Sequence, residues 1–115
     1  MSLSQFEYKK IKKLTTEYIE MRRPPLEIRD KVDLSFRIEN KSVIIFEIRP
    51  NWNDPTEKHE EFIVKATYIQ NKNIWKIYWQ RADLKWHSYK PLPEVDTYTK
   101  FLKALEADEC GCFFG

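Results

Sequence analysis

The sequence predicts an α+β domain: an N-terminal helix, an antiparallel meander of four to five strands and a C-terminal helix. Apolar residues recur at helical spacing in the segments 4–22 and 94–107. Between these segments, apolar and polar residues alternate in short runs, and polar turn sequences separate the runs. Because the strands are consecutive and the helices flank them, we expect both helices to pack on one face of the sheet.

The first helix is predicted over residues 4–22. Ser4 is a suitable N-cap, and Glu7 three residues later completes a capping box. Pro24-Pro25 should end the helix, because the residue before a proline disfavours the α conformation. A further short turn is expected over residues 26–30. The predicted buried stripe of the helix consists of Ile11, Leu14, Tyr18 and Met21.

A first hairpin is predicted from strands 32–39 and 42–49, joined by the turn Asn40-Lys41. A two-residue turn fixes the register, so Phe36 should lie opposite Ile45.

The same register places Leu34 opposite Glu47. Glu47 and Arg49 then share the apolar face of the hairpin near its open end, where charges need partners. We expect these two side chains to pair with each other or with a ligand.

A second hairpin should follow a loop at 50–59. The turn is Asn71-Lys72, and the register pairs Tyr68 with Trp75 and Val64 with Trp79. The residues expected on the inner face are Phe62, Val64, Ala66, Tyr68, Trp75, Ile77 and Trp79.

A short fifth strand is predicted over 85–89, after a tight connection through Asp83. Pro91 and Pro93 end the sheet. The last helix is predicted over 94–107, with a buried stripe of Val95, Tyr98, Leu102 and Leu105.

The chain has 115 residues, which is enough for a single domain spanning 1–115. No stretch approaches the ~20 apolar residues that a membrane span requires. The N-terminal residues have no apolar run typical of a secretory signal, so we expect a cytoplasmic protein with reduced thiols. Net charge is +2, with a basic cluster at Lys9–Lys13 that we interpret as a solvated helix face. The only glycines are Gly111 and Gly115, which excludes a glycine-rich phosphate loop and a dinucleotide fingerprint.

No motif predicts a cofactor or a metal centre. Cys110 and Cys112 are two thiols without further ligands at metal-binding spacing, so we interpret them as ordinary reduced cysteines. His87 has no recognisable nucleophile beside it. Glu47 and Arg49, with His87, define an alternative hypothesis of a metal-assisted hydrolase, although ion pairs within a sheet give the same pattern.

The segment 75–89 holds three of the four tryptophans. Trp75 and Trp79 are interpreted as sheet core because of their cross-strand partners. The remaining aromatic and basic residues are typical of a surface that stacks bases and neutralises phosphate. The candidate binding residues are Arg49, Trp52, Arg81, Trp86, His87 and Tyr89, with Lys85 beside them.

Short motifs spread along the sequence form a recognisable pattern. They are Arg23-x-Pro25, Arg29-Asp30, Phe46-Glu47-x-Arg49-Pro50-x-Trp52, Asp54-Pro55, Trp75-x-x-Tyr78-Trp79-x-Arg81, Trp86-His87-x-Tyr89, Glu106-x-Asp108 and Gly111-x-Phe113-Phe114-Gly115. Together they resemble a small bacterial family of domains of unknown function, DUF3024. The resemblance extends over nearly the whole chain, and this sequence departs from the family pattern at Cys110, Cys112, Phe114 and Asp83-Leu84. The resemblance implies the chain boundaries and implies no activity.

The leading hypothesis from the sequence is a binding module without catalytic activity or cofactor, whose partner is a protein or single-stranded nucleic acid. The first alternative is the hydrolase that uses Glu47, Arg49 and His87. The second is a protein that self-associates as a homodimer through an edge strand.

Overall fold

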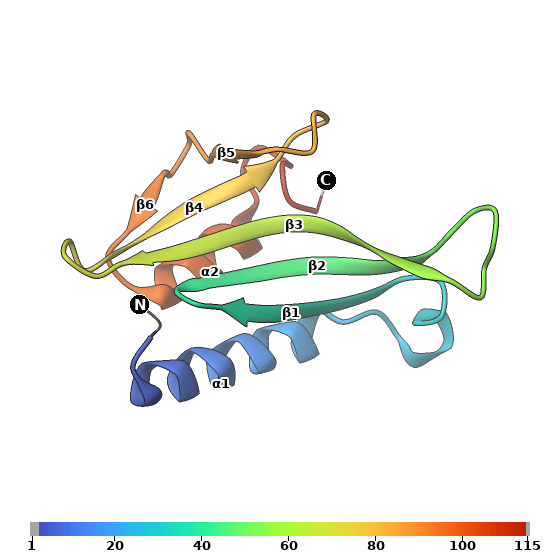
Figure 1. Ribbon diagram of the computed structural model, residues 1–115, viewed down its shortest axis with the longest axis horizontal. Helices are drawn as coiled ribbons and strands as arrows, with labels where there is room; N and C mark the ends of the chain where they lie inside the picture. The colour runs from blue at the N-terminus through green and yellow to red at the C-terminus, as the bar shows by residue number, and fades with distance from the viewer. Residues whose placement is uncertain (1–2, 115) are drawn as a thin grey trace.

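The computed structural model describes residues 3–114; Met1, Ser2 and Gly115, the last position of the family pattern, lie outside the described residues. An antiparallel sheet is flanked by one helix at each end of the sequence, as predicted (Figure 1). The elements are α1 (Gln5–Arg22), the 3-10 turn η1 (Leu26–Ile28), β1 (Asp33–Glu39), β2 (Ser42–Pro50), β3 (Lys58–Ile69), β4 (Ile74–Gln80), β5 (Trp86–Ser88), β6 (Glu94–Val95) and α2 (Tyr98–Ala107).

The sheet has the strand order β1-β2-β3-β4-β5, and β6 pairs with β4 on the same side as β5. Both helices contribute buried side chains to a single core on one face of the sheet. Ile45, Val64 and Ile77 form the sheet side of this core, and Phe101 and Leu105 of α2 close it. None of the helices within residues 3–114 is long and apolar enough to cross a membrane.

Helix α1 begins and ends where the sequence indicated. The Ser4 side chain accepts a hydrogen bond from the Glu7 backbone N–H, and Arg23 before Pro24 is the C-cap. The predicted stripe is wrong at Met21, which is 66% exposed, whereas Thr15 and Ile19 are buried. The 3.6-residue period carries the stripe from Ile11 through Thr15 and Ile19, and Met21 falls outside that arc.

The first hairpin has the predicted register, with Phe36 opposite Ile45 and Leu34 opposite Glu47. Asn40 adopts φ of 54°, a conformation that asparagine tolerates better than most residues. The second hairpin also has the predicted register, since Tyr68 pairs with Trp75 and Val64 with Trp79. The first turn has the two predicted residues, whereas the second has four, residues 70–73, rather than Asn71-Lys72 alone. The register is unchanged, because the longer turn takes one residue from each strand.

Strand β3 differs from the prediction in two respects. It begins at Lys58, so Lys58 and His59 belong to the strand rather than to the loop. It also carries a bulge, because Ile45 pairs with Val64 while the next residue, Phe46, pairs with Phe62. Ile63 is the extra residue, and an extra residue reverses the face of everything beyond it. Phe62 therefore points away from the helices, contrary to the predicted alternation.

The start of the last helix was also predicted too early. Glu94–Val95 forms β6, and α2 begins at Tyr98 with Thr97 as its N-cap. Val95 is buried as expected, but from a strand. Beyond α2, the Asp108 carboxylate accepts hydrogen bonds from the backbone N–H groups of Phe113 and Phe114, which folds the C-terminal segment back onto the core.

Candidate functional site

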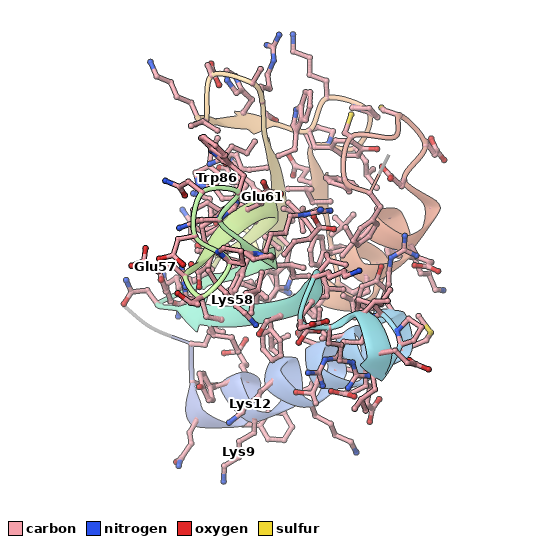
Figure 2. The ribbon with its side chains drawn as sticks, turned by 90° about the vertical axis from the view of Figure 1, so that its right-hand side faces the viewer. Lys9, Lys12, Glu57, Lys58, Glu61 and Trp86 are labelled. Atoms are coloured by element: carbon pink, nitrogen blue, oxygen red, sulfur yellow. The ribbon has the colours of Figure 1, made fainter. Side chains whose placement is uncertain are left out.

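The face of the sheet opposite the two helices is the most distinctive surface of the molecule, and we call it the open sheet face. One continuous rung crosses five strands on this face, because each residue pairs with the next in the ladders. Figure 2 shows Trp86 on the side of the sheet away from α1, and Lys9 and Lys12 projecting from the far side of that helix. The rung consists of Arg37, Ile44, Lys65, Tyr78 and Ser88.

Three aromatic rings form a chain on the open sheet face. The rings of Phe46 and Phe62 meet edge to face, with centroids 6.2 Å apart, and the rings of Phe62 and Trp86 are 5.9 Å apart at 35°. Phe46 is only 4% exposed although no helix covers it, whereas Phe62 and Trp86 remain half-buried. The rings thus shield one another and leave part of Phe62, Trp86 and neighbouring Tyr78 open to solvent.

Two cations lie over these rings. The Arg37 guanidinium carbon is 5.0 Å from the Phe46 centroid, and the Lys65 ammonium is 5.0 Å from the centroid of Trp86 and 5.2 Å from that of Tyr78. Such contacts are within the usual range for cation–π attraction. Burial lowers the pKa of Lys65, which indicates that its ammonium is partly removed from water.

The two cations differ in their acidic neighbours. Arg37 forms ion pairs with Glu39 at 2.8 Å and with Glu60 at 2.9 Å, so its charge is already compensated. Lys65 makes no ion pair within the described residues. The available positive charge of the open sheet face therefore lies on its β3–β4 side.

The β2–β3 hairpin extends past the end of α1, and we call residues 47–61 the arm (Figure 1). Arg49 lies on the arm and pairs with Glu47 at 3.0 Å and with Glu61 at 3.1 Å. Trp52 lies in the loop at the tip and is 94% exposed. The expected pairing of Glu47 with Arg49 is therefore present.

A hollow of about 480 Å³ lies under the base of the arm, and we call it the arm hollow. Glu47 and Arg49 line it on one side, and Leu34 of β1 lines it as well. Its other lining residues are Met21, Arg22, Pro24, Val32, Asp33 and Phe114.

Three further candidate residues gather at the end of β4 and β5. Tyr89 is only 2% exposed and packs against Phe113, with ring centroids 4.6 Å apart, so it belongs to the core. Burial raises the pKa of Tyr89 to about 12. His87 is 2.9 Å from the Asp83 carboxylate, and Arg81 lies over the Trp79 ring.

Arg81, His87 and Tyr89 line a second hollow, of about 310 Å³, together with Cys110 and Cys112. Both cysteines are free thiols, and burial raises the pKa of Cys112. Within residues 3–114, no group of three or more His, Cys, Asp or Glu side chains is arranged to hold a metal ion.

The six candidate binding residues are thus distributed over separate places. Trp86 lies on the open sheet face, while His87, the next residue, pairs with Trp79 on the helix-covered face. Glu47 and Arg49 line the arm hollow, and His87 lines the other hollow, so the residues of the hydrolase hypothesis do not share a cavity. The structure brings together Arg81, His87 and Tyr89, and separately Arg49 and Glu47.

Sequence reasoning missed Phe62, Lys65 and Tyr78 as surface residues. Tyr78 and Lys65 were readable from alternation, because each follows or precedes a residue assigned to the core. Phe62 carried a different signal: Phe62-Ile63-Val64 is an apolar run that breaks strict alternation, as a bulge does.

Comparison with known protein families identifies a match over nearly the whole chain. The family described as Domain of unknown function (DUF3024) matches residues 3–115. Searches of the curated proteins and of the solved structures gave no match. The matched region covers nearly the whole chain, including the residues of the open sheet face, the arm and the C-terminal segment, and the chain therefore belongs to the DUF3024 family.

Proposed function

We propose that the protein is a non-enzymatic binding module that holds single-stranded nucleic acid against its open sheet face. The observation that carries the proposal is the set of partly exposed rings on this face: Phe62 packs against Trp86, and Lys65 lies over the rings of both Trp86 and Tyr78. Aromatic faces stack on bases of any sequence, and nearby cations neutralise the phosphates. A sheet with exposed rings is a known way of holding unpaired bases.

The charge distribution supports a path over one half of the face. Glu39 at the end of β1 and Glu60 on the arm part of β3 both pair with Arg37 and would repel phosphate. Lys65 and Lys76 lie on β3 and β4 of the same face, and neither has an ion-pair partner among residues 3–114. We therefore expect the strand of nucleic acid to cross β3, β4 and β5 and to avoid β1.

The cellular setting belongs to the same proposal. We place this role in the bacterial cytoplasm, where the free thiols of Cys110 and Cys112 stay reduced.

The test is binding of fluorescently labelled single-stranded oligonucleotides, followed by anisotropy from low to high salt. We expect affinity to fall steeply with salt, because bound phosphates release counterions. Trp86→Ala should weaken binding roughly 5- to 150-fold, the usual value of one stacked base. Trp52→Ala is the matched control, since it removes a tryptophan that lies away from the open sheet face.

A second variant tests the contribution of the Lys65 charge to binding, with a separate check that the variant still folds. Lys65→Gln keeps most of the side-chain stem and should reduce both affinity and the slope of the salt dependence. Circular dichroism and thermal unfolding of each variant identify any loss of fold. Absence of binding at low salt, or equal affinity of wild type and Trp86→Ala, would refute the proposal. Binding of a protein ligand to this face without nucleic acid would replace it with a protein-recognition role.

A further inference from the structure

The C-terminal segment places two thiols beside each other at the second hollow, whose volume is about 310 Å³. Both thiols are free; Cys110 is exposed and Cys112 is half-buried. Burial, and after it the neighbouring Cys110 thiol, raises the pKa of Cys112. Burial and the same Cys110 thiol also raise the pKa of Tyr89. The Cys110 sulfur therefore lies close to both the second thiol and the Tyr89 hydroxyl.

The backbone holds the two cysteines in a bend. Gly111, between them, has φ of 66°, a conformation that glycine adopts without steric cost. The Gly111 N–H donates to the Asp108 carbonyl at 2.9 Å, and the Asp108 carboxylate accepts from the Phe113 N–H at 3.0 Å. In an extended chain, the Cα atoms of two residues so spaced would be about 7 Å apart, at the upper limit for a disulfide. The bend shortens this separation and makes a Cys110–Cys112 bond geometrically possible.

The two thiols differ in their access to solvent, and this difference assigns their roles. The exposed Cys110 thiol is open to a dissolved reagent, whereas the half-buried Cys112 thiol is better placed to react with its neighbour. An accessible thiol beside a resolving thiol is the usual arrangement of a reversible redox site. A disulfide closed over so short a loop is strained, so it is readily reduced again.

The lining of the hollow also indicates which reagent it suits. Arg81 and Lys90 line it, and neither forms an ion pair among residues 3–114. Two carboxylates near the hollow are already bound: Asp83 pairs with His87 at 2.9 Å, and Asp108 accepts from backbone N–H groups. Cations beside a nucleophile raise the local concentration of an anionic reagent.

We propose that Cys110 and Cys112 form a thiol–disulfide exchange site that reacts with an anionic peptide disulfide of the glutathione type. The Cys110 thiolate attacks one sulfur of this disulfide, its S–S bond breaks, and the leaving thiolate takes up the proton that Cys110 lost. Cys112 then loses its proton and attacks the Cys110 sulfur, and the second peptide thiol leaves with that proton. Two electrons pass from the protein to the peptide disulfide, so two peptide thiols and a Cys110–Cys112 bond are formed.

The test is incubation of the reduced protein with excess glutathione disulfide, followed by acid quenching, alkylation of the remaining thiols and measurement of the intact mass. The wild type should lose two hydrogen atoms, take up no alkyl group and regain both thiols in excess reduced glutathione. Cys112→Ser should stop at a mixed disulfide with one glutathione, because the resolving thiol is missing. Cys110→Ser should react at least roughly 10-fold more slowly, since only the half-buried thiol remains.

A second probe tests the basic lining. Hydroxyethyl disulfide carries no charge, so it separates recognition of carboxylates from reactivity of the thiols. The double variant Arg81→Gln, Lys90→Gln should react roughly 2- to 25-fold more slowly with glutathione disulfide and at an unchanged rate with hydroxyethyl disulfide. The double variant Lys9→Gln, Lys12→Gln removes the same charge from α1 and should leave both rates unchanged.

Two results for the wild type would overturn the inference. One is survival of both thiols in excess glutathione disulfide, and the other is accumulation of mixed disulfides at both cysteines without closure. These results require no variant, so they hold even where a substitution disturbs the fold, which circular dichroism detects. Equal effects of Arg81→Gln, Lys90→Gln on the two probes would overturn the preference for an anionic disulfide. No oligonucleotide is present, so the outcome is independent of the proposed nucleic-acid role.

Discussion

Asp33 illustrates what a single side chain does for this fold. Its carboxylate accepts two hydrogen bonds from the Arg23 guanidinium, each 2.9 Å long, and one from the Leu34 backbone N–H at 2.8 Å. Arg23 is the C-cap of α1, and Asp33 is the first residue of β1. The two-pronged contact therefore fixes the angle between the helix and the sheet. Bidentate pairs of this kind are the strong class of ionic hydrogen bond.

This contact makes stability depend on pH. The hydrogen bonds from Arg23 lower the pKa of Asp33, so the folded state favours the carboxylate more than the unfolded state does. The stabilisation is present above the unfolded pKa of about 3.9 and disappears as pH falls through the lower folded value. Asp33→Asn should cost about 1 kcal/mol of unfolding free energy at pH 7, since the pair is part-exposed.

The measurement is urea unfolding of wild type and Asp33→Asn from pH 7 to pH 2. The difference in unfolding free energy between the two proteins should become smaller toward low pH. Glu20→Gln is the control, because Glu20 pairs with the same arginine but is mostly exposed. A difference that stays constant over the whole range would show that the ion pair is not its source.

At the scale of elements, α1 and α2 are joined by a buried hydrogen bond. The Thr15 hydroxyl donates to the Ile11 carbonyl at 2.7 Å, so the Tyr98 hydroxyl, 2.6 Å away, donates to Thr15. Burial raises the pKa of Tyr98, which stays protonated as the donor. The sequence alone predicts no role for Thr15, because a threonine beside the apolar stripe of a helix can face either the core or solvent. Only the packing of α2 against α1 gives it a partner.

Thr15→Val should therefore leave the buried Tyr98 hydroxyl without an acceptor and cost roughly 1–3 kcal/mol of unfolding free energy. Thr16→Val is the matched control, since the Thr16 hydroxyl makes the same kind of bond to the Lys12 carbonyl in solvent. It should change stability by less than about 0.5 kcal/mol. Denaturant unfolding of the pair measures the difference, and equal losses for both variants would contradict a role for the buried contact.

At the scale of the whole molecule, one end of the sheet has a packed core between strands and helices, whereas no helix covers the arm at the other end. The core side chains lie where both helices cover the sheet, whereas the arm beyond Ile48 is a two-stranded ribbon, because β1 pairs with β2 no further than Ile48 (Figure 1). Two-stranded ribbons without packing are only marginally stable in water. Local opening is expected first where few apolar contacts are buried.

Native-state hydrogen exchange should therefore show slow amides in the rungs that join Val43, Ala66 and Ile77, and amides of the arm exchanging roughly 10- to 1,000-fold faster. Equal protection of arm and core would contradict this distribution of stability.

The sequence by itself determined the order of the two helices and the first five strands, the two hairpin registers and most of the core. These depend on local rules: Ser4 caps a helix, two prolines end it, and a short turn forces Leu34 opposite Glu47 and Val64 opposite Trp79. The family pattern likewise follows from the residues alone.

The tertiary structure decided which candidate residues lie close to one another. A single extra residue, Ile63, turns Phe62 of β3 to the open sheet face. There its ring contacts Trp86 of β5, although β3 and β5 are not adjacent in the sheet. Packing of the C-terminal segment buries Tyr89 against Phe113, and the length of the arm leaves Trp52 in solvent. The physical reason is the separation along the chain over which each kind of interaction acts. Capping and turn geometry act over a few residues of chain, whereas the grouping of side chains on a surface depends on contacts between segments distant in sequence.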